Sequence, residues 1–144
     1  MKRKKEIIQI VASVLLYSLF LGCGSEPEKY KEKMKSAFDS YDQITKDYDS
    51  YMRQMAKEGR GPSIQSGFES AKNMCLRLKK IDVSETPSDF QIPFKKRISL
   101  QCDNLNSPSD QITYEGDPSV KELDNIEQEL EKVSAKYGYD YKRP

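Results

Sequence analysis

The sequence predicts an all-α domain, a small bundle of about four helices. Four segments place apolar residues at intervals of three and four, which is the spacing of an amphipathic helix. No segment alternates apolar and polar residues with the β-branched enrichment typical of strands. The connections between the four segments are mostly short, and short connections favour helices that pack side by side around one core.

The first segment, residues 29–58, has a heptad pattern sustained over about four heptads, which predicts a long amphipathic helix. The glycines and the proline of residues 59–62 end it. Its two interleaved apolar sets are Tyr30, Ala37, Ile44 and Tyr51, and Met34, Tyr41, Tyr48 and Met55.

The second segment follows Pro62, and the start of the third has two readings. In one, Thr86 caps a helix whose first residue is Pro87. In the other, the regular part begins only near Pro93, because a proline inside a helix removes a hydrogen bond. The apolar faces comprise Ile64, Phe68, Ala71, Cys75, Leu78 and Ile81 in the second segment, and Phe94, Ile98, Cys102 and Leu105 in the third.

A long polar loop over residues 106–117 leads to the fourth segment, which has the clearest helix start. Asp117 is a suitable N-cap and Pro118 occupies the first helical position. Gly138 ends the helix, and we expect residues 139–144 to form a flexible tail. The apolar face comprises Val120, Leu123, Ile126, Leu130, Val133 and Tyr137.

The N-terminal residues have the layout of an export signal. The basic stretch Lys2–Lys5 precedes an apolar run from Ile7 to Leu21. This run is shorter than the roughly 20 apolar residues that a transmembrane helix needs, and its length suits a signal peptide. Gly22 is small enough to let a peptidase approach the backbone, and Cys23 supplies a thiol for lipid attachment.

The sequence Phe20-Leu21-Gly22-Cys23 resembles the lipobox of bacterial lipoprotein precursors, in the relaxed form of spirochaete lipoproteins, because Leu21 stands where a small residue is usual. The resemblance implies that residues 1–22 are removed and that Cys23 becomes the lipidated first residue, followed by a polar leash to residue 28. Gly24 replaces the Asp of lipoproteins retained at the inner membrane, which favours the outer membrane of the cell envelope and leaves the side of the membrane open. The alternative is an uncleaved anchor helix in which Cys23 is an incidental thiol.

Cys75 and Cys102 lie on the predicted apolar faces and are the only free thiols if Cys23 is lipidated. An exported compartment is usually oxidising, so an even pair indicates a disulfide. The alternative is two small buried hydrophobic residues. A bridge needs Cα atoms within about 7 Å. The two cysteines would lie at different heights if the third helix starts at Pro87, and at similar heights if it starts near Pro93.

Once residues 1–22 are removed, one small helical domain remains over residues 29–138. Residues 23–144 carry 20 basic and 22 acidic side chains, and this near-neutral balance predicts no nucleic-acid partner. The charged runs are interpreted as solvated faces. These runs are Lys79-Lys80, Lys95-Lys96-Arg97 and Lys142-Arg143, together with Glu127, Glu129 and Glu131.

The chain has no histidine, which excludes Ser–His and Cys–His nucleophile pairs and the commonest metal ligand. Asp47, Asp49 and Glu58 match three positions of a calcium-binding loop, but Met52 stands where that loop needs glycine. No glycine-rich phosphate loop and no zinc-ligand spacing is present. We therefore expect no catalytic residue, no metal and no cofactor.

These features predict a membrane-anchored envelope lipoprotein that acts as a non-catalytic helical binding module, with an envelope or host protein as its partner. Tyr30, Tyr41, Tyr48 and Tyr51 are the candidate interaction surface, because tyrosine contributes contact area at low entropic cost; alternatively, their rings fill the core. The second candidate function is a lipoprotein enzyme or a periplasmic small-ligand-binding protein that uses carboxylates and tyrosines. A filled core would favour the first function, a concave charged pocket would favour the second, and a shallow tyrosine-lined groove would not distinguish them.

Overall fold

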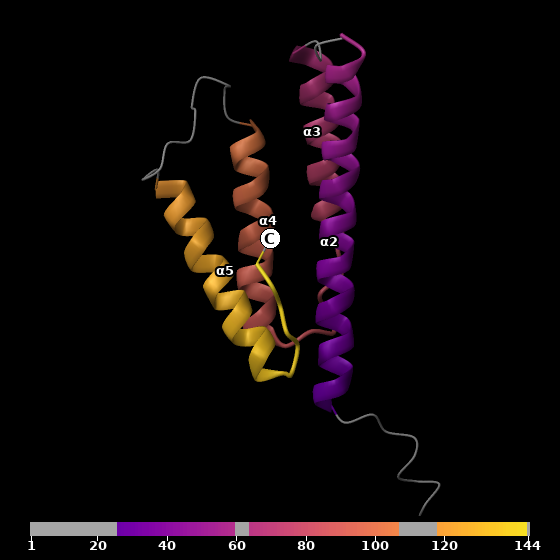
Figure 1. Ribbon diagram of the computed structural model, residues 1–144. Coiled ribbons are helices and arrows are strands. Elements are labelled where there is room, and N and C mark those ends of the chain that lie inside the picture. Colours follow the sequence, from indigo (N-terminus) through magenta and orange to yellow (C-terminus); the bar gives the residue numbers. More distant parts are fainter. Residues whose placement is uncertain (1–25, 60–63, 107–117, 144) are drawn as a thin grey trace, which may run out of the picture.

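The computed structural model describes residues 26–59, 64–106 and 118–143 and confirms the all-α prediction (Figure 1). Each helix packs against its neighbour in the chain, so that α2 and α3 form one hairpin and α4 and α5 form another. None of these described helices combines the length and the apolar character needed to cross a membrane. The helices are α2 (Glu26–Lys57), α3 (Ile64–Leu78), α4 (Ser88–Asn106) and α5 (Pro118–Lys136).

Helix α2 begins earlier than the sequence predicts. We expected a leash over residues 23–28 and a helix from residue 29, but the helix starts at Glu26. Pro27 fits there because the first turn of a helix needs no amide donors. Glu26 and Glu28 in the first turn and Lys57 in the last complement the helix dipole. With 32 residues, α2 is about 48 Å long.

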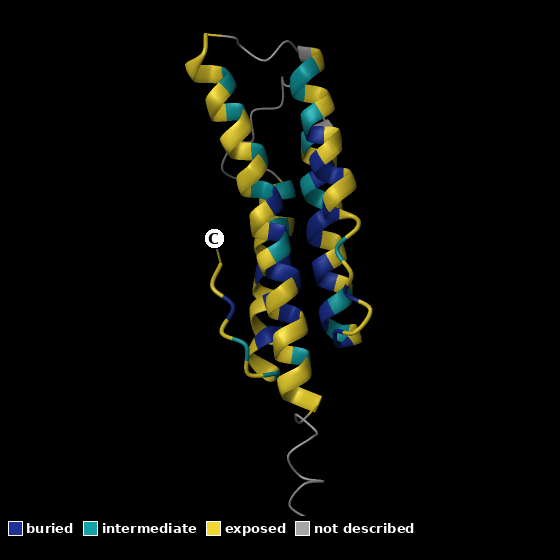
Figure 2. Ribbon diagram, turned by 90° about the vertical axis from the view of Figure 1, so that its right-hand side faces the viewer, coloured by how far each residue is buried: buried dark blue, intermediate teal, exposed yellow. Residues whose placement is uncertain are grey.

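An aromatic cluster forms the centre of the core. Phe38 of α2 meets the edges of Phe90 and Phe94 of α4, with ring centroids 5.4 and 5.6 Å apart. Figure 2 shows the buried residues gathered on the faces that the helices turn toward one another. Beyond Ile44, α2 has no buried side chain within the described residues, so the core ends before the helix does.

Helix α4 begins at Ser88, which supports the earlier of the two predicted starts. The carbonyl of Pro87 accepts hydrogen bonds from the amides of Phe90 and Gln91. Thr86 does not act as the cap, because its hydroxyl donates to the Val83 carbonyl at 2.7 Å. Pro93 lies inside the helix with its ring fully buried, so packing outweighs the hydrogen bond that it removes.

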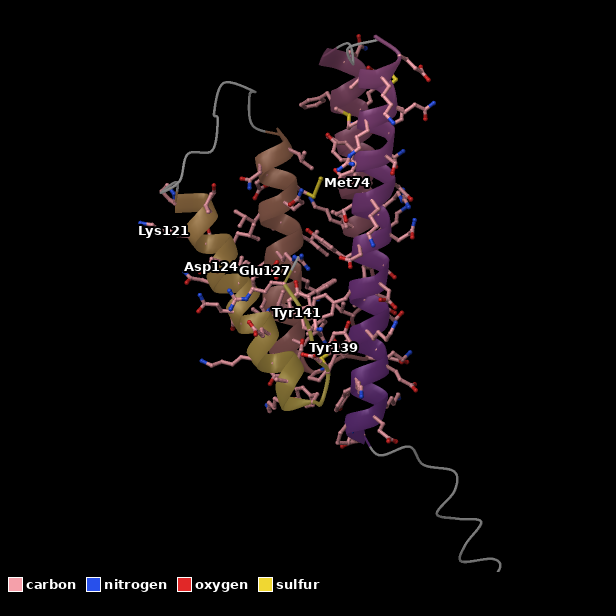
Figure 3. All side chains as sticks on the ribbon, in the orientation of Figure 1. Met74, Lys121, Asp124, Glu127, Tyr139 and Tyr141 are labelled. Carbon is pink, nitrogen blue, oxygen red and sulfur yellow. A yellow bond between two sulfur atoms is a disulfide. The ribbon has the colours of Figure 1, made fainter. Side chains whose placement is uncertain are left out.

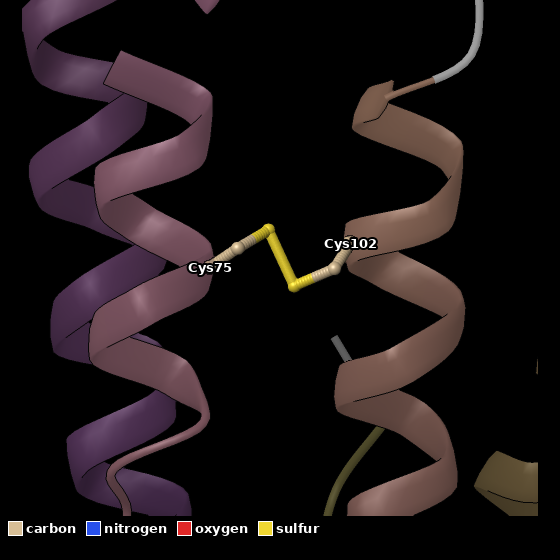
Figure 4. The surroundings of a disulfide bond; sticks show 2 residues. All are labelled: Cys75 and Cys102. Carbon is tan, nitrogen blue, oxygen red and sulfur yellow. A yellow bond between two sulfur atoms is a disulfide. The ribbon is translucent and has the colours of Figure 1, made fainter. Parts of the chain in front are cut away.

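Cys75 and Cys102 form the predicted disulfide between α3 and α4, with Cα atoms 5.6 Å apart (Figure 4). We expected the two cysteines to lie at similar heights only if α4 started near Pro93, and this expectation was wrong. Cys75 lies near the end of α3, and Cys102 lies far from the start of α4. Cys102 is therefore about 16 Å farther along its helix from the α3–α4 connection than Cys75 is. The connection from Lys79 to Pro87 is long enough to span this distance, because an extended chain covers about 3.3 Å per residue.

Gly138 ends α5 as predicted, and residues 139–143, which we expected to form a flexible tail, pack against the bundle. The amide of Tyr139 donates to the Ser134 carbonyl and that of Gly138 to the Ala135 carbonyl, which is the Schellman pattern. Gly138 has a φ of 75°, a conformation that glycine adopts at little cost. This turn sends residues 139–143 back along α5, and we call this segment the strap.

Candidate functional site

A buried ion pair links the middle of α4 to the middle of α5. Arg97 and Glu127 are 4% and 7% exposed, and the Arg97 Nε lies 2.7 Å from the Glu127 Oε1. Both residues were expected on solvated faces, and both expectations were wrong. Arg97 follows Phe94 by three residues and Glu127 follows Leu123 by four, so each falls on the apolar stripe of its own helix.

Two tyrosines complete this cluster. The Tyr141 hydroxyl donates a hydrogen bond to the Glu127 Oε2, and the Tyr41 ring lies 4.1 Å below the Arg97 guanidinium. Burial raises the pKa of both phenols, and the hydrogen bond to Glu127 raises the pKa of Tyr141 further. Within the described residues, the Arg97 Nη1 is buried and has no hydrogen-bond acceptor. The guanidinium is therefore held by one carboxylate and by the face of a ring.

The strap closes one half of the space between α2 and α5. The rings of Tyr139 and Tyr141 stack on Phe38 of α2, with centroids 5.6 and 4.1 Å away. Figure 3 shows Tyr139, Tyr141 and Glu127 gathered between the helices. Arg143 then pairs with Asp124 at 3.1 Å and with Glu131 at 2.8 Å, both on α5.

Burial of Tyr141 predicts a specific alkaline instability. The unfolded phenol ionises near pH 10, whereas the folded one has a raised pKa and stays protonated. Unfolding then releases a proton, so the contribution of Tyr141 is complete below about pH 10 and falls as the pH rises further. Melting temperatures between about pH 8 and 11 measure this. We expect a shallower alkaline decline in Tyr141→Phe than in wild type, and parallel declines would contradict the assignment.

Where the strap ends, a groove remains open between α2 and α5, with α3 and α4 at its base. The buried ion pair lies at one end of it, and exposed carboxylates of α2 and α5 form its rim. We call this the α2–α5 groove. Its aromatic, apolar and uncharged lining residues include Tyr41, Thr45, Tyr48, Met74, Val120 and Leu123.

The predicted tyrosine surface divides into separate places. Tyr41 and Tyr48 line the α2–α5 groove, and Tyr48 also borders a smaller hollow with Tyr51, which is 39% exposed. Tyr30 lies near the start of α2, where its ring meets the edge of Tyr137 at 5.6 Å. Tyr41 and Tyr48 are thus brought together in one groove, while Tyr30 lies at the other end of α2.

A second hollow lies between α2 and the end of α3, beside Lys35, Arg77 and Asp82. Its charges are largely matched by their own neighbours. Lys35 pairs with Asp39, Arg77 pairs with Asp47 at 2.7 Å, and Asp82 accepts the Ser84 amide at 2.9 Å. This surface is therefore ordinary solvated helix face.

Within residues 26–59, 64–106 and 118–143, no cluster of three or more Cys, Asp or Glu side chains could hold a metal ion. Asp47, which matches the first position of the calcium loop, instead pairs with Arg77. The predicted lipidation residue Cys23 and the predicted cap Asp117 lie outside the described residues. No family model matches the chain, and no curated protein or solved structure is similar to it at a meaningful level.

Proposed function

We propose that this chain is a lipid-anchored protein of the bacterial envelope whose helical domain binds another protein through the α2–α5 groove. The observation that carries the binding role is the open groove. The strap and the aromatic cluster fill part of the space between the hairpins, and the part that stays open has Tyr48, Val120 and Leu123 among its lining residues, beside charged side chains. Tyrosine-rich surfaces of this kind are enriched in protein interfaces.

The position of the groove suits an anchored protein. Helix α2 starts three residues after Cys23, so lipid on that residue would hold the first turn of α2 near the membrane. Tyr41 and Tyr48 follow Glu26 by 15 and 22 residues, which corresponds to about 23 and 33 Å along the helix. In Figure 1, the start of α5 lies toward the end of the bundle that is opposite the start of α2, and we call this end the open end of the bundle. Helix α2 thus acts as a stalk that presents the groove away from the membrane, with the outer membrane favoured by the residue after Cys23.

Loss of the cysteine thiol tests the anchor. We expect Cys23→Ala to abolish lipidation and to leave unprocessed precursor, because the thioether and the cleavage both depend on this side chain. Metabolic labelling with a fatty acid measures the first effect, and mass on a gel measures the second. Equal labelling of wild type and mutant would show that the chain is not a lipoprotein.

Capture from detergent-solubilised envelopes, with identification of what co-purifies, tests the binding role. We expect Leu123→Ser to lose the partner that wild type retains, because Leu123 is a half-buried apolar residue of the groove wall. Leu76→Ser is the matched control, since Leu76 is 54% exposed on α3 and does not line the groove. If both variants retain the partner equally, the groove is not the binding surface.

A further inference from the structure

Helix α2 repeats a Tyr-Asp pair after seven residues, as Tyr41-Asp42 and Tyr48-Asp49. Residues seven apart lie on the same face of a helix, about 10 Å apart along its axis. All four side chains line the α2–α5 groove. Each pair brings an aromatic ring and a carboxylate to the same groove, and both kinds of group attract a cation.

The ring of the first pair already holds a cation of the chain. The Arg97 guanidinium lies 4.1 Å from the centre of the Tyr41 ring. Burial raises the pKa of Tyr41, so the phenol stays neutral. The cation in this position comes from α4 of the same chain, and its charge is matched by Glu127.

The second pair offers the same groups to an outside cation. Among the described residues, no cation lies over the Tyr48 ring, and neither Asp42 nor Asp49 forms an ion pair. The Tyr48 ring is half-buried, so it is held in place, while the Asp49 carboxylate is exposed. Burial and the neighbouring Asp49 both raise the pKa of Tyr48, which keeps this phenol neutral as well.

The charge of the groove also favours a cationic occupant. Arg97 pairs with Glu127 and Arg143 with Asp124, so these charges cancel within the chain. The carboxylates that remain belong to the two Tyr-Asp pairs of α2, which leaves two negative charges without a partner along one wall. The opposite wall adds apolar surface, with Val120 44% exposed, beside the Asp124 that pairs with Arg143. A fitting ligand therefore combines positive charge with apolar surface.

We propose that the α2–α5 groove binds a basic segment of the partner protein, with an arginine or lysine on Tyr48 beside Asp49 and an apolar neighbour against Val120. This inference rests on the proposed function, because it names the chemistry of the partner for the same groove. The strap is an internal example: the Tyr141 ring enters the space between the hairpins, and the Arg143 guanidinium pairs with carboxylates of α5.

The chain's own connection between α4 and α5 does not match this chemistry. Residues 107–117 contain three carboxylates and no lysine or arginine. Like charges repel across short distances, so the acidic wall of the groove disfavours this segment. This connection therefore does not supply the complementary charge.

Binding of a labelled arginine–leucine peptide to the full-length protein in detergent, followed by fluorescence anisotropy, tests the proposal. We expect Tyr48→Leu and Asp49→Asn each to weaken binding about threefold to tenfold, while Tyr48→Phe binds as wild type because it keeps the ring face. Glu28→Gln removes a charge from the exposed first turn of the same helix and is the matched control. A glutamate–leucine peptide should not bind.

Equal peptide affinity in wild type, Tyr48→Leu and Asp49→Asn would overturn the proposal. Dimerisation of the free protein that Asp49→Lys abolishes would also overturn it, because a second copy would then occupy the groove. The proposed function itself fails if Leu123→Ser and Leu76→Ser retain the envelope partner equally. If Leu123→Ser loses the envelope partner while Tyr48→Leu and Asp49→Asn keep it, the groove is an interface but its occupant is not a basic segment.

Discussion

Arg97→Ala is expected to lower the melting temperature by about 10–20 °C, the largest effect of any single substitution considered. The variant leaves the Glu127 carboxylate buried without its cation, and breaking a buried pair in this way costs about 3–5 kcal/mol of unfolding free energy. It also removes the guanidinium that covers the Tyr41 ring. For a domain of this size, each kcal/mol corresponds to roughly 3–5 °C. Thermal unfolding followed by circular dichroism measures the loss.

Two matched variants separate the buried charge from other causes. Arg143→Ala removes an arginine of an exposed pair, where screening by solvent makes the expected loss small. The triple variant Arg97→Met, Glu127→Leu and Tyr141→Phe removes all three polar partners together, and it should recover most of the stability because neither member of the ion pair is left buried without the other. A loss in Arg97→Ala no larger than that in Arg143→Ala would show that the pair is not buried in solution.

The helices were predictable from the sequence because each depends on nearby residues. The heptad of α2, the apolar stripe of α5 and the stop at Gly138 are local signals, and the structure follows them closely. The apolar stripes predicted burial wrongly where the exposure of a residue depends on elements that are distant in the sequence. Phe68 lies on the predicted face of α3 but is 54% exposed, in the first part of α3, which extends beyond the end of α4 (Figure 1).

The buried ion pair could not be predicted from the sequence of either helix alone. Within one helix, a charged residue in a polar run is usually solvated, and Lys95 and Lys96 are exposed as expected. The position of Arg97 on the Phe94 stripe becomes meaningful only when Glu127 occupies the matching position on α5, 30 residues later in the chain. Such pairs depend on how two helices align, and the spacing within each helix does not specify that alignment.

Part of the signal for the strap is local in the sequence. Gly138 was identified as a helix stop, but a Schellman turn also reverses the chain, and Tyr139 and Tyr141 then alternate with polar residues as an extended segment with one apolar face does. The missing information was the position of Phe38, which receives both rings. The groove follows from the same fact, because it is the part of the space between α2 and α5 that the strap does not fill.

Reduction of the Cys75–Cys102 bridge is expected to lower the melting temperature by about 10 °C. The bridge closes a loop with a sequence separation of 27, for which the loop-entropy model gives about 3 kcal/mol. Thermal unfolding with and without reductant measures this effect. The Cys75→Ala/Cys102→Ala variant is the control, because its melting temperature should not respond to reductant.

The bridge should matter most at the open end of the bundle. Cys102 is the last buried residue of α4 within the described part of the chain, and none of the described side chains of α3 before Ala71 is buried. The disulfide therefore ties the two hairpins together where the core ends and the groove begins (Figure 4). We expect reduction to accelerate amide hydrogen exchange in α3 and in the second half of α4 more than around Phe38, since local opening follows the weakest packing. Two free thiols in the lipidated protein, counted under denaturing and non-reducing conditions, would show that these cysteines are only buried side chains, and exchange in the groove would then not respond to reductant.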